Sequence, residues 1–323
     1  MQYYMAPMEG LTGYIYRNAY HKHYGGVDRY FTPFITNKKL NHKEINDVMP
    51  EHNEGMEVVP QILTNRADDF LFITEELKKY GYERVNLNLG CPSGTVVAKN
   101  RGAGFLALPK ELDVFLDEIF SNCTMRISIK TRIGKESPEE WEHLLSIYEK
   151  YPMEELIIHP RVQKDFYRNT VNLDAFKLAA EQSGQSLCYN GDICTVADDA
   201  RVREAFPEID KIMIGRGILK KPWLVQEIRS CREESAQAEL TAKNETEAKQ
   251  RLRAFHDEVL AGYASVMYGD KNTLFKMKEL WVYLSESFTN PEKYIKKIRK
   301  CERIKDYEIW VDALFREQEL ICQ

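Results

Sequence analysis

The sequence predicts a parallel α/β barrel of eight strands, a (β/α)8 TIM barrel, followed by a small all-helical C-terminal domain. Three observations carry this prediction. Eight short β-rich runs recur through the first two-thirds of the chain, amphipathic helical segments lie between them, and strand signals stop after about residue 230. This alternation is typical of parallel sheets covered by helices. With 323 residues and 43% hydrophobic composition, the chain can bury a substantial core in one or two domains.

The eight expected strands are short apolar runs that end at turn-forming or polar residues. They cover residues 3–8, 28–34, 57–63, 84–90, 126–132, 155–161, 186–192 and 211–217. A doubly wound sheet is the main alternative, because it also alternates strands and helices. Such a sheet normally carries a GxGxxG turn after an early strand, and this chain has no GxGxxG. The pattern therefore favours the barrel.

Two segments between the expected strands carry helix signals. Residues 67–81 have apolar side chains at helical spacing and close on Gly81. Residues 137–151 begin with Ser137 as an expected N-cap, and Glu140 follows at the spacing of a capping box. Both helices are expected to pack on the outside of the barrel.

The character of the chain changes after the last expected strand. Residues 231–250 are rich in Ala and Glu and contain no aromatic residue, which indicates a polar linker or the exposed start of a helix. Residues 290–304 begin with Asn290 and Pro291, which is a helix-start signal. We therefore expect a barrel domain over 1–235 and a helical domain over 240–323.

Composition excludes several classes of protein. The formal net charge is −5, so nucleic-acid binding would require a local basic face. The cysteine count is 7, an odd number, and no CxxC occurs, so we expect neither disulfides nor a metal site. There is no apolar run of roughly 18 residues and no signal-peptide pattern, so we expect a cytoplasmic protein without a membrane span.

Candidate site residues stand at the ends of seven of the eight expected strands, where barrel enzymes place their chemistry. These strand-end residues are Met8, Glu9, Gln61, Asn88, Cys91, Lys130, Arg132, His159, Arg161, Asn190, Asp192, Gly215 and Arg216. The last two loops, 190–192 and 214–217, contain glycines that let backbone N–H groups approach an anion. Arg216 can add a charge-assisted contact. These loops predict a site for a phosphorylated cofactor.

Six motifs occur in order between the N-terminus and about residue 228. They are APMEGLT (6–12), NLNLGCPS (86–93), KTRIG (130–134), IIHPR (157–161), YNGDI (189–193) and IGRGILKKPWL (214–224). In this combination the sequence resembles the tRNA-dihydrouridine synthases of the bacterial type. The resemblance implies an FMN-binding barrel, a helical C-terminal domain, and reduction of specific uridines in tRNA to 5,6-dihydrouridine with NADPH (or NADH) as electron donor.

The resemblance also assigns roles to residues. Cys91 matches the proton donor. The implied FMN-binding residues are Pro7, Met8, Glu9, Gln61, Lys130, His159, Asn190, Gly191, Asp192, Gly215 and Arg216. The implied uracil contacts are Asn88, Arg132 and Tyr167. The family usually has a small residue where this chain has Glu9, so a backbone contact is expected there.

The chemistry explains why a cysteine would stand after the fourth strand. A hydride added to C6 of uracil leaves negative charge toward C5, and a proton must then reach C5. A thiol is ordinarily protonated at neutral pH, so Cys91 can act as the acid. Gly90 and Pro92 fit a tight turn that aims it. Lys130 near flavin N1 would stabilise the reduced, anionic flavin.

RNA must also be held outside the pocket. Residues 271–305 contain ten Lys or Arg against four Glu, and Lys293, Lys296, Lys297 and Lys300 are expected on one side of a helix. This stretch predicts a surface that contacts RNA phosphates. No obligate protein partner is expected.

Two other functions stay open. One is an FMN-dependent reductase or dehydrogenase of a free pyrimidine or enoate, similar to dihydroorotate dehydrogenase. The other is a noncatalytic RNA-binding protein on a relict barrel. Ribosomal RNA also stays open as the substrate of a dihydrouridine synthase.

Overall fold

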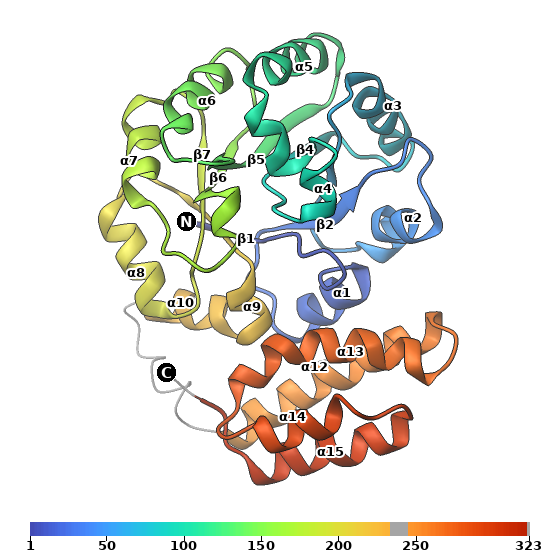
Figure 1. Ribbon diagram of the computed structural model, residues 1–323. Coiled ribbons are helices and arrows are strands. Elements are labelled where there is room, and N and C mark those ends of the chain that lie inside the picture. The colour runs from blue at the N-terminus through green and yellow to red at the C-terminus, as the bar shows by residue number, and fades with distance from the viewer. Residues whose placement is uncertain (233–244, 322–323) are drawn as a thin grey trace. The chain divides into compact units, whose positions relative to one another are not determined.

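The computed structural model describes residues 1–232 and 245–321. Eight parallel strands close into a barrel in chain order, and β8 pairs back onto β1 (Figure 1). The strands are β1 (Gln2–Met5), β2 (Arg29–Ile35), β3 (Val58–Ile62), β4 (Arg84–Leu89), β5 (Arg126–Gly134), β6 (Leu156–Val162), β7 (Leu187–Asn190) and β8 (Lys211–Ile214). All eight predicted strands are present, and the TIM barrel is confirmed.

Apolar side chains from most of the strands meet in one buried cluster. Its members are Tyr4, Ala6, Phe31, Val59, Ile157, Cys188 and Met213. The strand register then brings polar residues near the carboxyl ends together. Asn88 of β4 pairs with Lys130 of β5, and Arg132 of β5 pairs with His159 of β6. Residues that are distant in the sequence therefore become neighbours at one end of the barrel.

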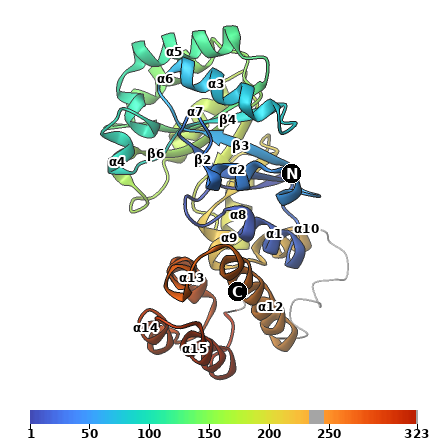
Figure 2. The same ribbon diagram turned by 90° about the vertical axis from the view of Figure 1, so that its right-hand side faces the viewer.

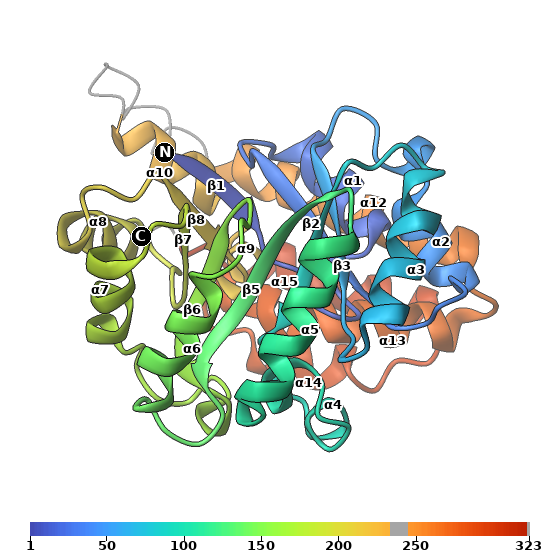
Figure 3. The same ribbon diagram turned by 90° about the horizontal axis from the view of Figure 1, so that it is seen from above.

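Helices lie outside the strands, as Figure 3 shows for α5 and α6 beside β5. Between β2 and β8 the helices are α2 (His42–Val48), α3 (Ala67–Lys78), α4 (Gly94–Val97), α5 (Pro109–Asn122), α6 (Glu140–Tyr148), α7 (Leu173–Gln182) and α8 (Val196–Ala205). The helix predicted over 67–81 is α3, and Gly81 follows it with φ of +85°.

The helix predicted over 137–151 begins three residues late, at Glu140. The reason is the Glu140 carboxylate, which accepts hydrogen bonds from the N–H groups of Lys135, Glu136 and Ser137 at 2.7–2.9 Å. These bonds fold the segment into a turn before the helix starts. The Ser137 side chain does not cap the helix, so the predicted capping box is only half formed.

Residue contacts divide the chain into two compact units. The first consists of Met1–Pro7, Asp28–Asp192 and Val202–Ile214, and it contains all eight strands. The second consists of Met8–Val27, Ile193–Arg201 and the described residues from Gly215 onward. Of the polar segment predicted over 231–250, residues 233–244 lie outside the described residues.

The second unit is helical in its C-terminal part, where α12 to α15 form a group of neighbouring helices (Figure 2). Its helices are α1 (Tyr14–His23), α9 (Arg216–Lys220), α10 (Leu224–Arg232), α12 (Glu245–Val266), α13 (Asp270–Leu284), α14 (Glu292–Ile298) and α15 (Ile304–Glu317). The predicted C-terminal helices are therefore confirmed.

A polar network is buried in the core of this helical group. The Trp281 indole N–H donates to Tyr307 Oη at 2.6 Å, and Tyr307 Oη lies 2.5 Å from His256 Nε2. His256 Nδ1 lies 2.8 Å from an Asp257 carboxylate oxygen, which can only accept. His256 therefore carries its proton on Nδ1 and is neutral. Burial is the main cause that lowers the pKa of His256 from its usual 6.5.

Candidate active site

Asn88 holds the backbone on which Cys91 stands. Its side-chain oxygen accepts hydrogen bonds from the N–H groups of Gly90 at 3.0 Å and Cys91 at 2.9 Å. Its amide group donates to Gln61 Oε1 at 2.7 Å. Cys91 is a half-buried cysteine, and one residue, Gly90, separates it from the end of β4. The turn that aims the thiol is thus fixed by the last polar side chain of the strand.

Gly102 closes the Cys91 turn from the other side. Gly102 has φ of +54°, and a Cβ atom there would lie 2.9 Å from both the Cβ and the carbonyl oxygen of Cys91. The next residue, Ala103, donates its N–H to that same carbonyl at 3.1 Å. Sequence reasoning missed this contact. The spacing of Gly102 and Gly104 was the available signal.

Gln61 takes part in a chain of hydrogen bonds across the barrel strands. Besides accepting from Asn88, it donates to Asn86 Oδ1 at 2.7 Å, and Asn86 donates to Ser128 Oγ at 2.9 Å. Gln61 has no exposed surface. This arrangement joins β3, β4 and β5 under the Cys91 turn. The flavin contact expected of Gln61 stays a prediction.

Arg132 is buried and donates hydrogen bonds to three backbone carbonyl groups. Its Nε donates to the Gly90 carbonyl at 3.0 Å, Nη1 to the Val162 carbonyl at 2.9 Å, and Nη2 to the Phe166 carbonyl at 2.7 Å. The side chain is 1% exposed. Arg132 therefore ties the Cys91 turn to the loop after β6. The uracil contact expected of Arg132 stays a prediction.

The loop after β6 brings Tyr167 and His159 together. Their ring centroids are 6.1 Å apart at an interplanar angle of 29°, and the Arg132 guanidinium carbon lies 5.4 Å from the Tyr167 ring centroid. Tyr167 is 43% exposed. Tyr167 is thus partly accessible to solvent, and the uracil contact expected of it stays a prediction.

Arg161 was noted at a strand end but was given no role by the sequence. Its Nη1 donates to His159 Nε2 at 2.9 Å, which makes that nitrogen an acceptor and the ring neutral. It also forms an ion pair with Asp192. The Asp192 carboxylate is therefore committed to a cation of the protein, and any contact of Asp192 to a phosphate would come from its backbone.

The end of β7 is tightly packed. Asn190 Nδ2 donates to the Met213 carbonyl on β8 at 2.8 Å. A Cβ atom on Gly191 would lie 2.8 Å from Val171 Cγ1, and Asp192 has φ of +46°. A side chain at 191 would therefore require Val171 to shift, and the anion contact expected of this loop stays a prediction.

Lys130 is the unpartnered cation of the site. No hydrogen bond or ion pair joins its ammonium group to another residue within 1–232 and 245–321. Burial, and then the nearby Arg132 charge, lower the pKa of Lys130 to about 8. A desolvated ammonium group without a partner is costly unless a ligand supplies one. Lys130 is therefore positioned for an anionic or electron-rich ligand.

The remaining predicted residues follow β1 and β8. Pro7 ends the first segment of the first unit, whereas Met8 and Glu9 belong to the second. There the Met8 carbonyl accepts N–H bonds from Leu11 and Thr12 at 3.0 Å, which makes a tight turn. Met8 and Glu9 thus belong to a different unit from the strand-end residues described above, and the flavin contacts expected of them stay predictions.

Gly215 and Arg216 also belong to the second unit, where Gly215 is the N-cap of α9 and Arg216 its first residue. A Cβ atom on Gly217 would lie 2.0 Å from the Ile193 carbonyl oxygen, so the start of α9 packs closely on that backbone. The phosphate contacts expected of Gly215 and Arg216 stay predictions.

The basic stretch of the helical region is exposed. All four predicted RNA-contacting lysines, Lys293, Lys296, Lys297 and Lys300, are exposed. None of them forms an ion pair with another described residue. The prediction that all four share one helix is wrong for Lys300, because α14 ends at Ile298 and a turn follows.

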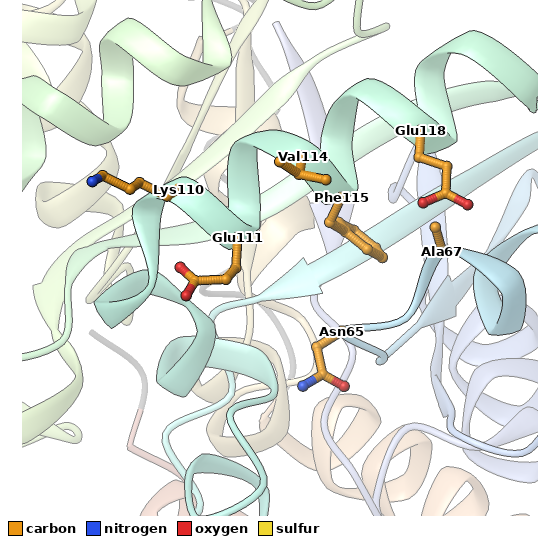
Figure 4. Close-up of a pocket in the computed structure, with 7 residues that line it drawn as sticks. All are labelled: Asn65, Ala67, Lys110, Glu111, Val114, Phe115 and Glu118. Carbon is orange, nitrogen blue, oxygen red and sulfur yellow. The ribbon is translucent and has the colours of Figure 1, made fainter.

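A separate depression of about 410 Å³ lies between the start of α3 and α5 (Figure 4). Its lining residues are Asn65, Ala67, Lys110, Glu111, Val114, Phe115 and Glu118. None of them is a predicted site residue.

Among the described residues, no cluster of three or more His, Cys, Asp or Glu could hold a metal ion. No helix in the described ranges has both the length and the apolar character that a membrane span requires.

Comparison with known proteins agrees with this geometry. The family model described as "Dihydrouridine synthase (Dus)" matches residues 4–317. The chain is 28% identical over 230 residues to tRNA-dihydrouridine synthase B of Pasteurella multocida (strain Pm70), covering 70% of this chain and 68% of that protein. It is 26% identical over 230 residues to a probable tRNA-dihydrouridine synthase of Staphylococcus aureus (strain COL), covering 68% and 69%.

Solved structures share the fold at low identity. A variant of NCR from Zymomonas mobilis aligns with a TM-score of 0.50 and 12% identity, covering 71% of this chain and 86% of that one. A 2-naphthoyl-CoA reductase aligns with a TM-score of 0.54 and 9% identity, covering 71% and 50%. These similarities speak for the barrel alone. Because the family model spans nearly the whole sequence, the chain belongs to the dihydrouridine synthase family.

Proposed function

We propose that this protein is a flavin enzyme that reduces specific uridines of tRNA to 5,6-dihydrouridine, with FMN as its flavin and NADPH as the electron donor. Family membership and the names of the relatives support the reaction and the substrate. The observation that carries the proposal is the Cys91 turn, which Asn88, Gly102 and Arg132 hold beside the unpartnered Lys130. We place the reaction in the cytoplasm.

The residues at the strand ends fit a flavin. No hydrogen bond or ion pair joins the Lys130 ammonium group to another described residue, and a side chain on Gly191 would lie close to Val171. Lys130, His159, Asn190 and Gly191 would hold the cofactor, and the contacts expected of Met8, Glu9, Gly215 and Arg216 stay predictions. When bound, FMN would supply the hydride that adds to C6 of uracil.

The chain's own residues complete the reduction. The Cys91 thiol gives its proton to C5, so hydride and proton together saturate the C5–C6 bond. Asn88 and Arg132 keep the thiol in place through the backbone of Gly90 and Cys91. Tyr167 offers an exposed aromatic face against which the uracil can stack.

We further propose that the barrel occupies 1–235 and that the helical region over 240–323 binds RNA. The target uracil must leave its RNA stack to reach the barrel, so the rest of the RNA needs a separate docking surface. The exposed lysines without ion-pair partners near α14 support this surface.

One variant tests the central step. Cys91→Ala should keep FMN and oxidise NADPH at the parent's rate, whereas dihydrouridine formation in tRNA should fall about 10²–10⁴-fold, the usual contribution of a general acid. Cys123→Ala is the matched control, because Cys123 is also a half-buried cysteine but lies after α5.

Mass analysis of the released cofactor should find one FMN per chain. FAD, or no flavin after reconstitution, would overturn the cofactor assignment. Normal dihydrouridine formation by Cys91→Ala would overturn the role of the thiol. Activity on free uracil or dihydroorotate, without activity on tRNA, would favour a small-molecule reductase. Activity on ribosomal RNA alone would change the substrate but not the chemistry.

A further inference from the structure

A pocket of about 500 Å³ opens beside α14, within the second unit. One wall is the turn Ser285–Ser287, and the other is α14 with the two residues beyond its end. Ile295, which is 6% exposed, lines it from the buried face of α14. Its volume is in the range of small-ligand sites, so it can take a phosphate together with part of its sugar.

The charge of the pocket is positive. Lys296, Arg299 and Lys300 line it, are exposed, and form no ion pair with any other described residue. Two carboxylates also line it, those of Glu286 and Glu292. Glu286 is paired with Lys220 Nζ at 2.6 Å. The three cations therefore outweigh the one carboxylate that lacks such a pair.

The turn that forms one wall is anchored. Besides the Glu286–Lys220 ion pair, Ser287 Oγ donates to the Lys220 carbonyl. Lys220 is the last residue of α9, the helix that begins with Arg216. The Ser285–Ser287 wall of the pocket is thus attached to the end of α9, the helix that begins at Arg216. Such a fixed wall makes the pocket a site of defined shape.

We propose that this pocket binds a phosphodiester group of the RNA, and that it binds the RNA more strongly than the rest of the α14 surface does. The inference rests on the proposed function, which makes RNA the partner. Arg299 can bind two phosphate oxygens through its planar fork, and Lys296 and Lys300 add point charges. A contact to phosphate and sugar positions the RNA without reading its sequence.

The same helix provides a matched control. Lys293 and Lys297 are also exposed and form no ion pair with the residues that the structure describes, but they do not line the pocket. Their ammonium groups lie 5.3 Å from the ring centroids of Tyr294 and Trp310, respectively. Two double variants, Lys296→Gln with Lys300→Gln and Lys293→Gln with Lys297→Gln, therefore remove the same charge from neighbouring positions.

The experiment measures the affinity of each double variant, loaded with FMN, for a tRNA transcript at several salt concentrations. The pocket pair should lower affinity and reduce the log–log salt slope by about 1.4–1.8, since each lost contact removes about 0.7–0.9. The control pair should lower the affinity and the slope by less than the pocket pair does, because Lys293 and Lys297 belong to the proposed RNA surface but do not line the pocket. NADPH oxidation should be unchanged in both and reports that the barrel is intact.

Equal losses in the two double variants would overturn the proposal, because a diffuse field would then explain binding. A parent that does not bind tRNA would overturn it as well. The proposed function fails separately: a parent that binds tRNA through the pocket but forms no dihydrouridine would keep the pocket and reject the reaction. Arg299→Lys gives a second check, because it keeps the charge and should still weaken binding if the fork is used.

Discussion

Replacing Gly102 with alanine should displace the Cys91 turn without removing any group that takes part in the proposed reaction. Gly102 has φ of +54°, which costs an L-residue about 1–2 kcal/mol. Its new Cβ would also lie 2.9 Å from both the Cβ and the carbonyl oxygen of Cys91. Overpacking of this kind costs about 1–3 kcal/mol, so Gly102→Ala should lose about 2–5 kcal/mol of unfolding free energy unless the turn moves.

The turn is the part that can move, and its movement is measurable. Dihydrouridine formation should fall about tenfold to a hundredfold, because small displacements of a catalytic group cost rates of this order. NADPH oxidation should change little. Gly94→Ala is the matched control: Gly94 begins α4, and a Cβ there would meet nothing within 4 Å. It should leave activity unchanged and raise stability by a few tenths of a kcal/mol, up to about 1 kcal/mol.

Urea unfolding and single-turnover RNA reduction of the two variants decide the matter. If Gly102→Ala matches Gly94→Ala in both measurements, the close packing of Gly102 on Cys91 does not exist in solution. If Gly102→Ala is destabilised but fully active, the packing is real and the position of the thiol does not limit the rate.

Two further predictions concern titrating groups. The parent's FMN affinity should fall about tenfold as pH rises from 7 to 9, because Lys130 loses its proton through a pKa of about 8, and Lys130→Met should bind FMN weakly at both pH values; identical pH profiles would exclude the contact. His256 is native in its neutral form, with its pKa held below 6.5 by burial. The folded state therefore loses stability as pH falls below about 6.5, where the unfolded chain takes up a proton. Urea unfolding should show that the free energy of unfolding falls less between pH 7.5 and pH 5.5 for His256→Gln than for the parent. Equal falls in the two proteins would contradict this account.

Much of the fold was predictable because barrel strands repeat a simple pattern. Each strand is a short apolar run that ends in a polar or glycine-containing loop, and eight repeats leave few alternative architectures. Helix boundaries were less predictable. The start of α6 depends on Glu140, whose carboxylate accepts three backbone N–H groups upstream. No capping residue or glycine in the sequence marks the end of α14 at Ile298.

That Asn88 lies beside Lys130, and Arg132 beside His159, was also predictable, since strand ends meet at one edge of a barrel. Their contacts were not. Asn88, Arg132 and Gln61 were all expected to contact uracil or flavin, yet each has hydrogen bonds to other parts of the protein. A sequence shows where a polar side chain stands, but its partners depend on neighbours contributed by other strands. Arg161 illustrates the same limit, because its pairing with Asp192 joins β6 to the loop after β7.

These contacts explain how one thiol can be positioned by a loop. Cys91 lies on a turn, and a turn without further contacts would not fix the position of the sulfur atom closely enough for proton transfer. Three independent groups restrict it: Asn88 from its own strand, Arg132 from the neighbouring strand, and Gly102 from the segment that follows. Asn88 and Arg132 act on backbone atoms of Gly90 and Cys91, and Gly102 packs on the Cβ and carbonyl oxygen of Cys91. In the proposed reaction these residues would therefore matter even where they touch neither uracil nor flavin, because they would supply the fixed geometry that a short acidic side chain requires.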